Sequence, residues 1–136
     1  MAITYKIWKK KFRNSQKEEV EKYFACKMTM NTLSTKQVAE RITEVSSLSE
    51  GDFLSSLSQI SWVLKTFLSL GQNITLDGIG TFSISVTSSP MDSPEDLSKA
   101  KIKAKRVVFR QAPELKQILD NLEFKQVNKK RSPNIK

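Results

Sequence analysis

Asn73-Ile74-Thr75-Leu76-Asp77-Gly78-Ile79-Gly80-Thr81-Phe82 is the stretch of the chain that decides the fold. Two short strand-like runs flank a turn in which two glycines stand two positions apart. Glycine accepts a positive φ and the close approach of another backbone, so this spacing predicts a tight reversal between antiparallel strands. The turn alone is also consistent with an ordinary β-hairpin. The neighbouring segments are therefore needed to identify the fold.

Two helices are predicted immediately before this turn. Ser34 or Thr35 begins the first helix, which runs to about Val45, and Ser49 begins a second of about 20 residues that ends near Leu70. The second helix carries a wide apolar stripe: Phe53, Leu54, Leu57, Ile60, Trp62, Val63, Leu64, Phe67 and Leu68. Leaving so much apolar surface in water is unfavourable, so the stripe predicts a dimer interface. The alternative is that the N-terminal part of the chain covers it.

The residues before these helices form a predicted extension. Residues 3–12 alternate as a strand, and residues 20–29 are expected to form a second strand, with a short helix over 17–27 as the alternative. Tyr5 and Trp8 are expected to pack in the core or at a dimer interface, with a base-stacking surface as the alternative. A run of cations nearby is either a second basic patch for DNA or a solvated hairpin end: Lys9, Lys10, Lys11 and Arg13.

Beyond the turn, residues 81–87 alternate strictly between apolar and hydroxyl side chains, which predicts a strand. Residues 88–98 are rich in turn formers, with one helical turn expected at 93–96. A basic strand follows over 101–110. Lysines 99, 101, 103 and 105 are expected on one of its faces, with Ile102, Ala104 and Arg106 on the other. The alternative is an edge strand that lysines protect from aggregation. Pro113 then begins a short helix at 114–122, and Phe124 and Val127 could add a last strand.

Charge and composition narrow the classes of function. The net charge of +9 is segregated, because residues 1–34 carry eight cations and three acids (+5), residues 35–90 three and five (−2), and residues 91–136 twelve and six (+6). Such segregation favours a polyanionic partner, with plain solubility as the alternative. The chain lacks histidine and a phosphate-binding glycine loop, so neither an enzyme, a metal site, a cofactor nor a small-molecule substrate is expected. Neither a signal peptide nor a membrane span is predicted, which favours a cytoplasmic location.

The order of these elements, with two motifs, resembles the HU/IHF family of bacterial histone-like DNA-binding proteins. Residues 76–82, Leu-Asp-Gly-Ile-Gly-Thr-Phe, are similar to the family's Gly-Phe-Gly-Thr-Phe turn and strand. Residues 107–110, Val-Val-Phe-Arg, are similar to the segment that enters its Phe-Lys-Pro-Gly-Lys motif. The resemblance covers residues 34–124. The additional N-terminal residues resemble the extended HU-related group found in Bacteroidetes-type bacteria.

The resemblance implies an α+β fold in which a helical dimer base carries a β-sheet saddle with two β-arms. It implies a homodimer on double-stranded DNA in the bacterial nucleoid, binding without sequence specificity and bending the duplex. Three segments are expected: an N-terminal hairpin extension at 1–33, an HU-like domain at 34–127 and a basic tail at 128–136. The expected DNA-binding residues are Lys99, Lys101, Lys103, Lys105, Arg106 and Arg110.

The predicted arm departs from the family pattern. The family's Arg-Asn-Pro tip is replaced by a stretch in which Pro90 is the candidate wedge, close to Asp92, Glu95 and Asp96. Acids near phosphates are repelled, so the alternative function is an HU-fold structural or interaction protein with weak or lost DNA bending.

Overall fold

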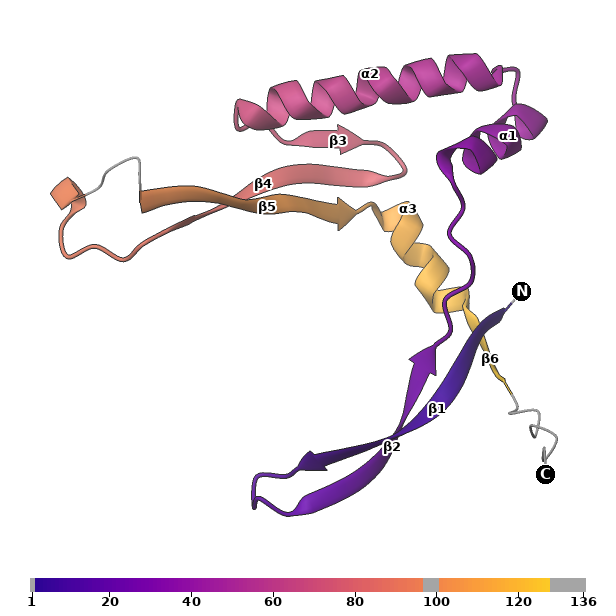
Figure 1. Cartoon of the computed structure of the whole chain (residues 1–136). Coiled ribbons are helices and arrows are strands. Elements are labelled where there is room, and N and C mark those ends of the chain that lie inside the picture. Colours follow the sequence, from indigo (N-terminus) through magenta and orange to yellow (C-terminus); the bar gives the residue numbers. More distant parts are fainter. Residues whose placement is uncertain (1, 97–100, 128–136) are drawn as a thin grey trace, which may run out of the picture. The chain divides into compact units, whose positions relative to one another are not determined.

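The described part of the chain has an α+β fold with three α-helices and two three-stranded sheets (Figure 1). The computed structural model describes residues 2–96 and 101–127. Two compact units make up the chain: Leu33–Ile118 forms one, and Met1–Thr32 together with Leu119–Lys136 forms the other. The segment boundaries expected at 33/34 and 127/128 stay a prediction.

The unit Leu33–Ile118 contains the helices and the Gly-x-Gly hairpin. Its elements in chain order are α1 (Thr35–Val45), α2 (Glu50–Ser69), β3 (Ile74–Leu76), β4 (Gly80–Ser88), the 3-10 turn η1 (Pro94–Asp96), β5 (Ile102–Gln111) and α3 (Pro113–Lys116). The strands form an antiparallel sheet in the order β3-β4-β5. Ser34 and Ser49 cap α1 and α2 through capping boxes, which confirms both predicted helix starts.

The last helix is shorter than the sequence predicts. Pro113 begins it as expected, but α3 ends at Lys116 and gives way to the 3-10 segment η3 (Gln117–Asn121). The expectation of one regular helix over 114–122 was therefore wrong.

The turn between β3 and β4 needs both of its glycines for different reasons. The Ile79 N–H donates to the Leu76 carbonyl oxygen at 3.0 Å, and Gly78 takes a φ of 79°, as the third residue of a type II turn requires. A Cβ on Gly80 would lie 2.3 Å from the backbone oxygen of Arg110 and 2.6 Å from the Phe109 ring. Gly80 thus allows β5 to approach β4 closely at the base of the sheet.

We expect Gly80→Ala to lower the free energy of unfolding by more than about 2 kcal/mol, because neither the backbone oxygen nor the packed ring can move without breaking sheet contacts. Gly51→Ala is the matched control. Its added Cβ meets only the Ser49 Oγ, at 3.9 Å, and alanine favours a helix. Chemical denaturation measures both variants, and equal stabilities would contradict the packing described at Gly80.

One face of the β3-β4-β5 sheet packs against α2. Phe82 and Phe109 are cross-strand partners whose ring centroids lie 5.1 Å apart. Ile84 lines the same small cavity as Phe82 and α2 residues Leu64 and Leu68. Leu68 is buried, so the C-terminal half of α2 supports the sheet.

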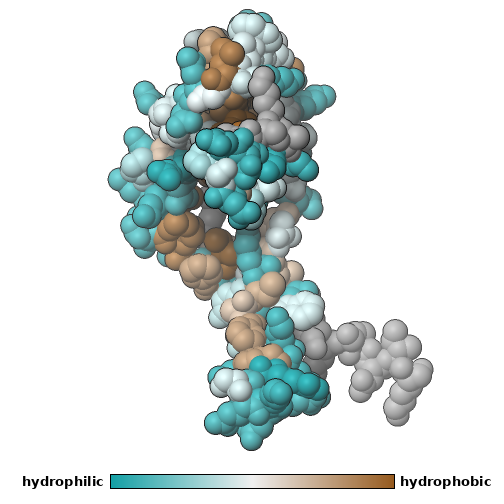
Figure 2. All heavy atoms as spheres, turned by 90° about the vertical axis from the view of Figure 1, so that its left-hand side faces the viewer, coloured by the Kyte–Doolittle hydropathy of each residue, from teal (hydrophilic) through white to brown (hydrophobic). Residues whose placement is uncertain are grey.

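Much of the remaining apolar surface is uncovered. Among the described residues, only Ala39 and Leu68 are buried hydrophobics. Trp62 is 58% exposed, and Leu57 and Ile60 in the middle of α2 are also exposed. Hydrophobic residues accordingly reach the surface in patches in Figure 2. A domain of this size normally buries a larger core.

The second unit is a sheet in the order β2-β1-β6, made from β1 (Ala2–Arg13), β2 (Glu19–Lys27) and β6 (Glu123–Gln126). β1 and β2 are antiparallel around a turn in which the Asn14 side chain accepts from the N–H groups of Gln16 and Glu18. β6 runs parallel to β1. The strand expected at 20–29 is confirmed, and the alternative helix at 17–27 does not form.

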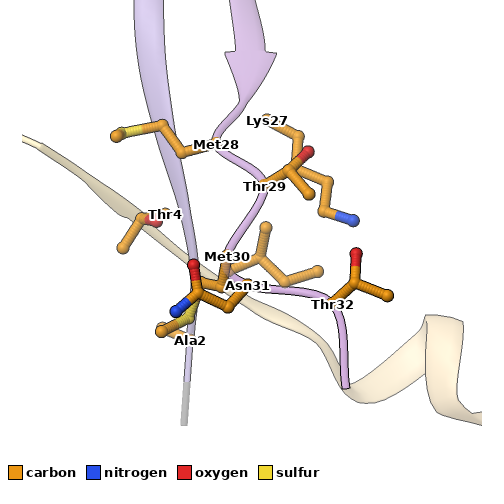
Figure 3. A pocket seen from close by; sticks show the side chains of 9 residues that line it. Ala2, Thr4, Lys27, Met28, Thr29, Met30, Asn31 and Thr32 are labelled. Carbon is orange, nitrogen blue, oxygen red and sulfur yellow. The ribbon is translucent and has the colours of Figure 1, made fainter. Parts of the chain in front are cut away.

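A shallow pocket lies where the chain leaves β2 (Figure 3). Residues 28–32 line it together with the start of β1, and the Met28 N–H donates to the Thr4 carbonyl oxygen at 2.9 Å. Lys27 supplies its one charged side chain. Within the described residues, no cluster of His, Cys, Asp or Glu could hold a metal ion, and no helix has the length and hydropathy needed to cross a membrane.

Candidate nucleic-acid interface

An irregularity in β5 decides where its cations lie. Ser85 on β4 is paired with Arg106, but the next residue, Val86, is paired with Ala104. Lys105 is therefore an extra residue without a partner in the register, which is the definition of a β-bulge. Side chains along a strand point alternately to its two faces. One extra residue at position 105 therefore moves each residue of β5 before it to the opposite face from the one that regular alternation predicts.

The bulge produces two chemically distinct faces. Val107 and Phe109 follow the bulge, and Ile102 and Ala104 precede it, yet their register partners on β4 all belong to one face. On this face, Phe82, Ile84 and Val107 line a cavity with residues of α2. The opposite face, here called the basic face, carries Lys103, Arg106 and Arg110 with their partners on β4: Thr87, Ser85 and Thr81. Hydroxyl and cationic groups together suit a phosphate backbone.

The alternation expected for the basic strand was thus wrong in two respects. Arg106 lies on the same face as Lys103, and Lys105 is the bulged residue. Ile102 and Ala104 share the face of Val107 and Phe109. The apolar face is therefore continuous, and Arg106 does not interrupt it as the sequence had predicted. The sequence did contain the signal, because apolar residues change from even to odd positions between 104 and 107.

The remaining predicted cations of this region lie at the start of the strand. Lys101 directly precedes β5 and is half-buried, and its carbonyl oxygen accepts from the Ser89 N–H at 3.1 Å. Lys99 lies outside the described residues. The three ion pairs formed among residues 2–96 and 101–127 do not involve the cations of this strand. Those cations are therefore available to an external anion.

The far end of β4 and β5 has a different character. Pro90 is exposed in the loop after β4, and η1 follows with Glu95 and Asp96 in its single turn, as the sequence predicts. Asp92 is exposed between them. The sheet thus carries cations along its length and acids near its tip.

The cations of the N-terminal strand do not form one patch. Lys9 and Lys11 are on one face of β1, where both contact Glu21, at 2.6 and 3.4 Å. Arg13 is on that face too, opposite Glu19. Lys10 lies on the other face, opposite Lys22.

Two cations near Lys10 were missed by the sequence analysis. Lys6 and Lys22 share its face of the β1-β2 hairpin. The alternation of residues 3–12 places Lys6 with Lys10, and centring the hairpin on Asn14–Glu18 would have placed Lys22 opposite Lys10.

Comparison with known proteins agrees with this architecture. Residues 1–126 match a family model described as an HU domain fused to wHTH, Ig, or Glycine-rich motif. A comparison with curated proteins finds no match. Among solved structures, the chain is similar to a protein of Bacteroides vulgatus ATCC 8482 that is provisionally described as a bacterial DNA-binding protein. The TM-score is 0.61 at 9% identity, over 96% of this chain and 50% of that one.

These two similarities differ in what they show. The structural match is too remote in sequence to show more than a shared fold, and this chain spans about half the length of that structure. The family model covers 126 of 136 residues, including both units of the structure. The chain is therefore a member of the family that this model represents, the HU-HIG family.

Proposed function

We propose that the chain binds double-stranded DNA without sequence specificity and bends it, as a homodimer within the bacterial nucleoid. Two lines of support are the HU domain of the family model and the DNA-binding description of the Bacteroides protein. The observation that carries the proposal is the bulge at Lys105. It places Lys103, Arg106 and Arg110 on one face of the sheet while α2 supports the other.

In the proposed dimer, the helices form the base and the two β3-β4-β5 sheets form the saddle that faces the duplex. The exposed apolar surface of α2 supports this assignment, because a second copy would cover it. The β4-β5 pair forms the arm. Cations on phosphates supply most of the affinity, and the duplex is selected by how easily it bends.

A salt titration tests the electrostatic part of the proposal. If Lys101, Lys103, Arg106 and Arg110 of both subunits contact phosphates, eight contacts give a slope of about −7 for log K against log salt concentration. Binding of a random-sequence duplex, followed by fluorescence anisotropy between 50 and 200 mM salt, measures this slope. A slope near zero would contradict the proposal.

Bending is tested separately, because the acidic residues near the tip favour the alternative of an HU-fold interaction protein that bends DNA weakly. In our proposal Pro90 inserts between base steps. We expect Pro90→Ala to reduce the bend of a duplex carrying a fluorophore pair at its ends, with affinity changing less than about threefold because phosphate contacts remain. An unbent duplex with the unmodified protein would favour the alternative. An unchanged bend in the variant would reject Pro90 as the wedge.

A further inference from the structure

The β1-β2 hairpin has an aromatic face that the proposed duplex site does not use. Trp8 and Phe24 are directly opposite each other in the register, and they are 60% and 47% exposed. Phe12 lies farther along the same face, with its ring centroid 6.3 Å from that of Phe24. Three aromatic rings therefore line one side of a two-stranded ribbon. Phe12 is half-buried, whereas the two exposed rings are unfavourable in water and indicate an interaction surface.

Cations are interleaved with these rings. Lys10 is directly opposite Lys22, between the Trp8–Phe24 pair and the Phe12–Val20 pair, and Lys6 is opposite Cys26. Like charges directly opposite each other on a sheet are destabilising. The acids of β2, Glu19 and Glu21, belong to the other face of the hairpin. The aromatic face thus keeps three lysines without an acidic partner on the hairpin.

The chemistry of this face discriminates between possible occupants. A second copy packed face to face would bring two sets of lysines together and remove them from water without counter-charges, which is costly. A partner that carries flat apolar groups along a negatively charged chain would cover the rings and neutralise the lysines at the same time. Single-stranded nucleic acid has this composition, because each base offers a stacking surface and each linkage a phosphate.

We propose that the face formed by Trp8, Phe12, Phe24, Lys6, Lys10 and Lys22 binds single-stranded nucleic acid. Bases stack on the rings, and the lysines contact the phosphates on either side. This site lies on a different unit from the basic face of β4-β5, so the inference does not rest on the proposed duplex function.

Affinity for a fluorescent 20-nucleotide oligo(dT) tests the inference, with the full chain carrying Lys103→Glu, Arg106→Glu and Arg110→Glu to remove the basic face. We expect Trp8→Ala and Phe24→Ala each to weaken binding about tenfold or more. Lys10→Gln with Lys22→Gln, which leaves the rings in place, should weaken it comparably. Tyr23→Ala is the matched control, because Tyr23 is exposed but belongs to the other face; it should change binding less than twofold.

Two further readouts locate the oligonucleotide. In a Trp62→Phe background, which leaves Trp8 as the one tryptophan, fluorescence should be quenched by stacking. Alkylation of Cys26, an exposed residue of the same face, should slow when oligo(dT) is bound. Three lysine contacts give an expected salt slope of about −2. Oligo(U) in parallel shows whether RNA binds equally well.

Two results would overturn the inference. In the first, oligo(dT) and oligo(U) bind with affinities that the Trp8 and Phe24 variants leave unchanged. In the second, Cys26 is protected only as protein concentration rises without oligonucleotide, which would mean that a second copy covers the face. Loss of duplex binding in the background variant, with oligo(dT) binding retained, separates this site from the proposed duplex site.

Discussion

Replacing Lys103, Arg106 and Arg110 with glutamate is expected to weaken binding to a random duplex at least about 1000-fold near 0.1 M salt. The three side chains belong to one face because of the bulge at Lys105. Six phosphate contacts are lost per proposed dimer, and each glutamate repels the phosphate that the original cation attracted. The salt slope should fall at the same time, which distinguishes lost contacts from general misfolding.

The control for this variant carries an equal change in charge elsewhere. Lys17, Lys36 and Arg41 are exposed and lie outside the β3-β4-β5 sheet. Their replacement with glutamate lowers the net charge by the same six units but leaves the basic face intact. We expect this control to bind within about tenfold of the unmodified protein, since distant exposed charges are screened. Equal losses in both triple variants would mean that net charge, and not the basic face, determines binding.

Glutamate at Leu57 and Ile60 is expected to raise the dissociation constant of the proposed homodimer at least about 1000-fold. Both side chains are exposed on α2 in the single chain. Each apolar side chain buried by a second copy contributes about 1.5–3 kcal/mol, and the substitution occurs in both subunits. Sedimentation equilibrium measures the change. The melting temperature should fall too, because folding and association are linked in such a dimer.

Ser56→Glu with Gln59→Glu is the matched control on α2. These exposed polar residues receive the same charge at neighbouring positions. We expect the control to remain dimeric. A monomeric unmodified protein, or a dimer that the Leu57 and Ile60 substitutions leave intact, would reject the assignment of this surface to a homodimer.

The sequence predicts the helices and the hairpin because local chemistry determines them. Ser34 and Ser49 bond to backbone N–H groups of their own helices, and Gly78 takes the positive φ of its own turn. Such features depend on residues near in sequence. The resemblance to the HU/IHF family rests on the same local motifs and agrees with the family model.

The arrangement of the cations was less predictable, because it depends on pairing between distant segments. Strict alternation placed Lys105 with Lys103, whereas pairing with β4 requires a bulge that keeps Ile102 and Ala104 on the face of Phe109. The extra residue at position 105 allows the apolar residues on both sides of it to lie on a single face of the sheet. Likewise, only the hairpin register reveals that Glu21 neutralises Lys9 and Lys11 while Lys10 faces Lys22.

Protection of a single introduced cysteine tests most directly whether the basic face contacts duplex DNA. In a Cys26→Ser background, Thr87→Cys places a thiol opposite Lys103, and Ser47→Cys places one in the exposed connection between α1 and α2. With saturating random duplex, we predict that alkylation at position 87 slows at least about tenfold while alkylation at position 47 is unchanged. Equal alkylation rates at position 87 with and without DNA would contradict the account.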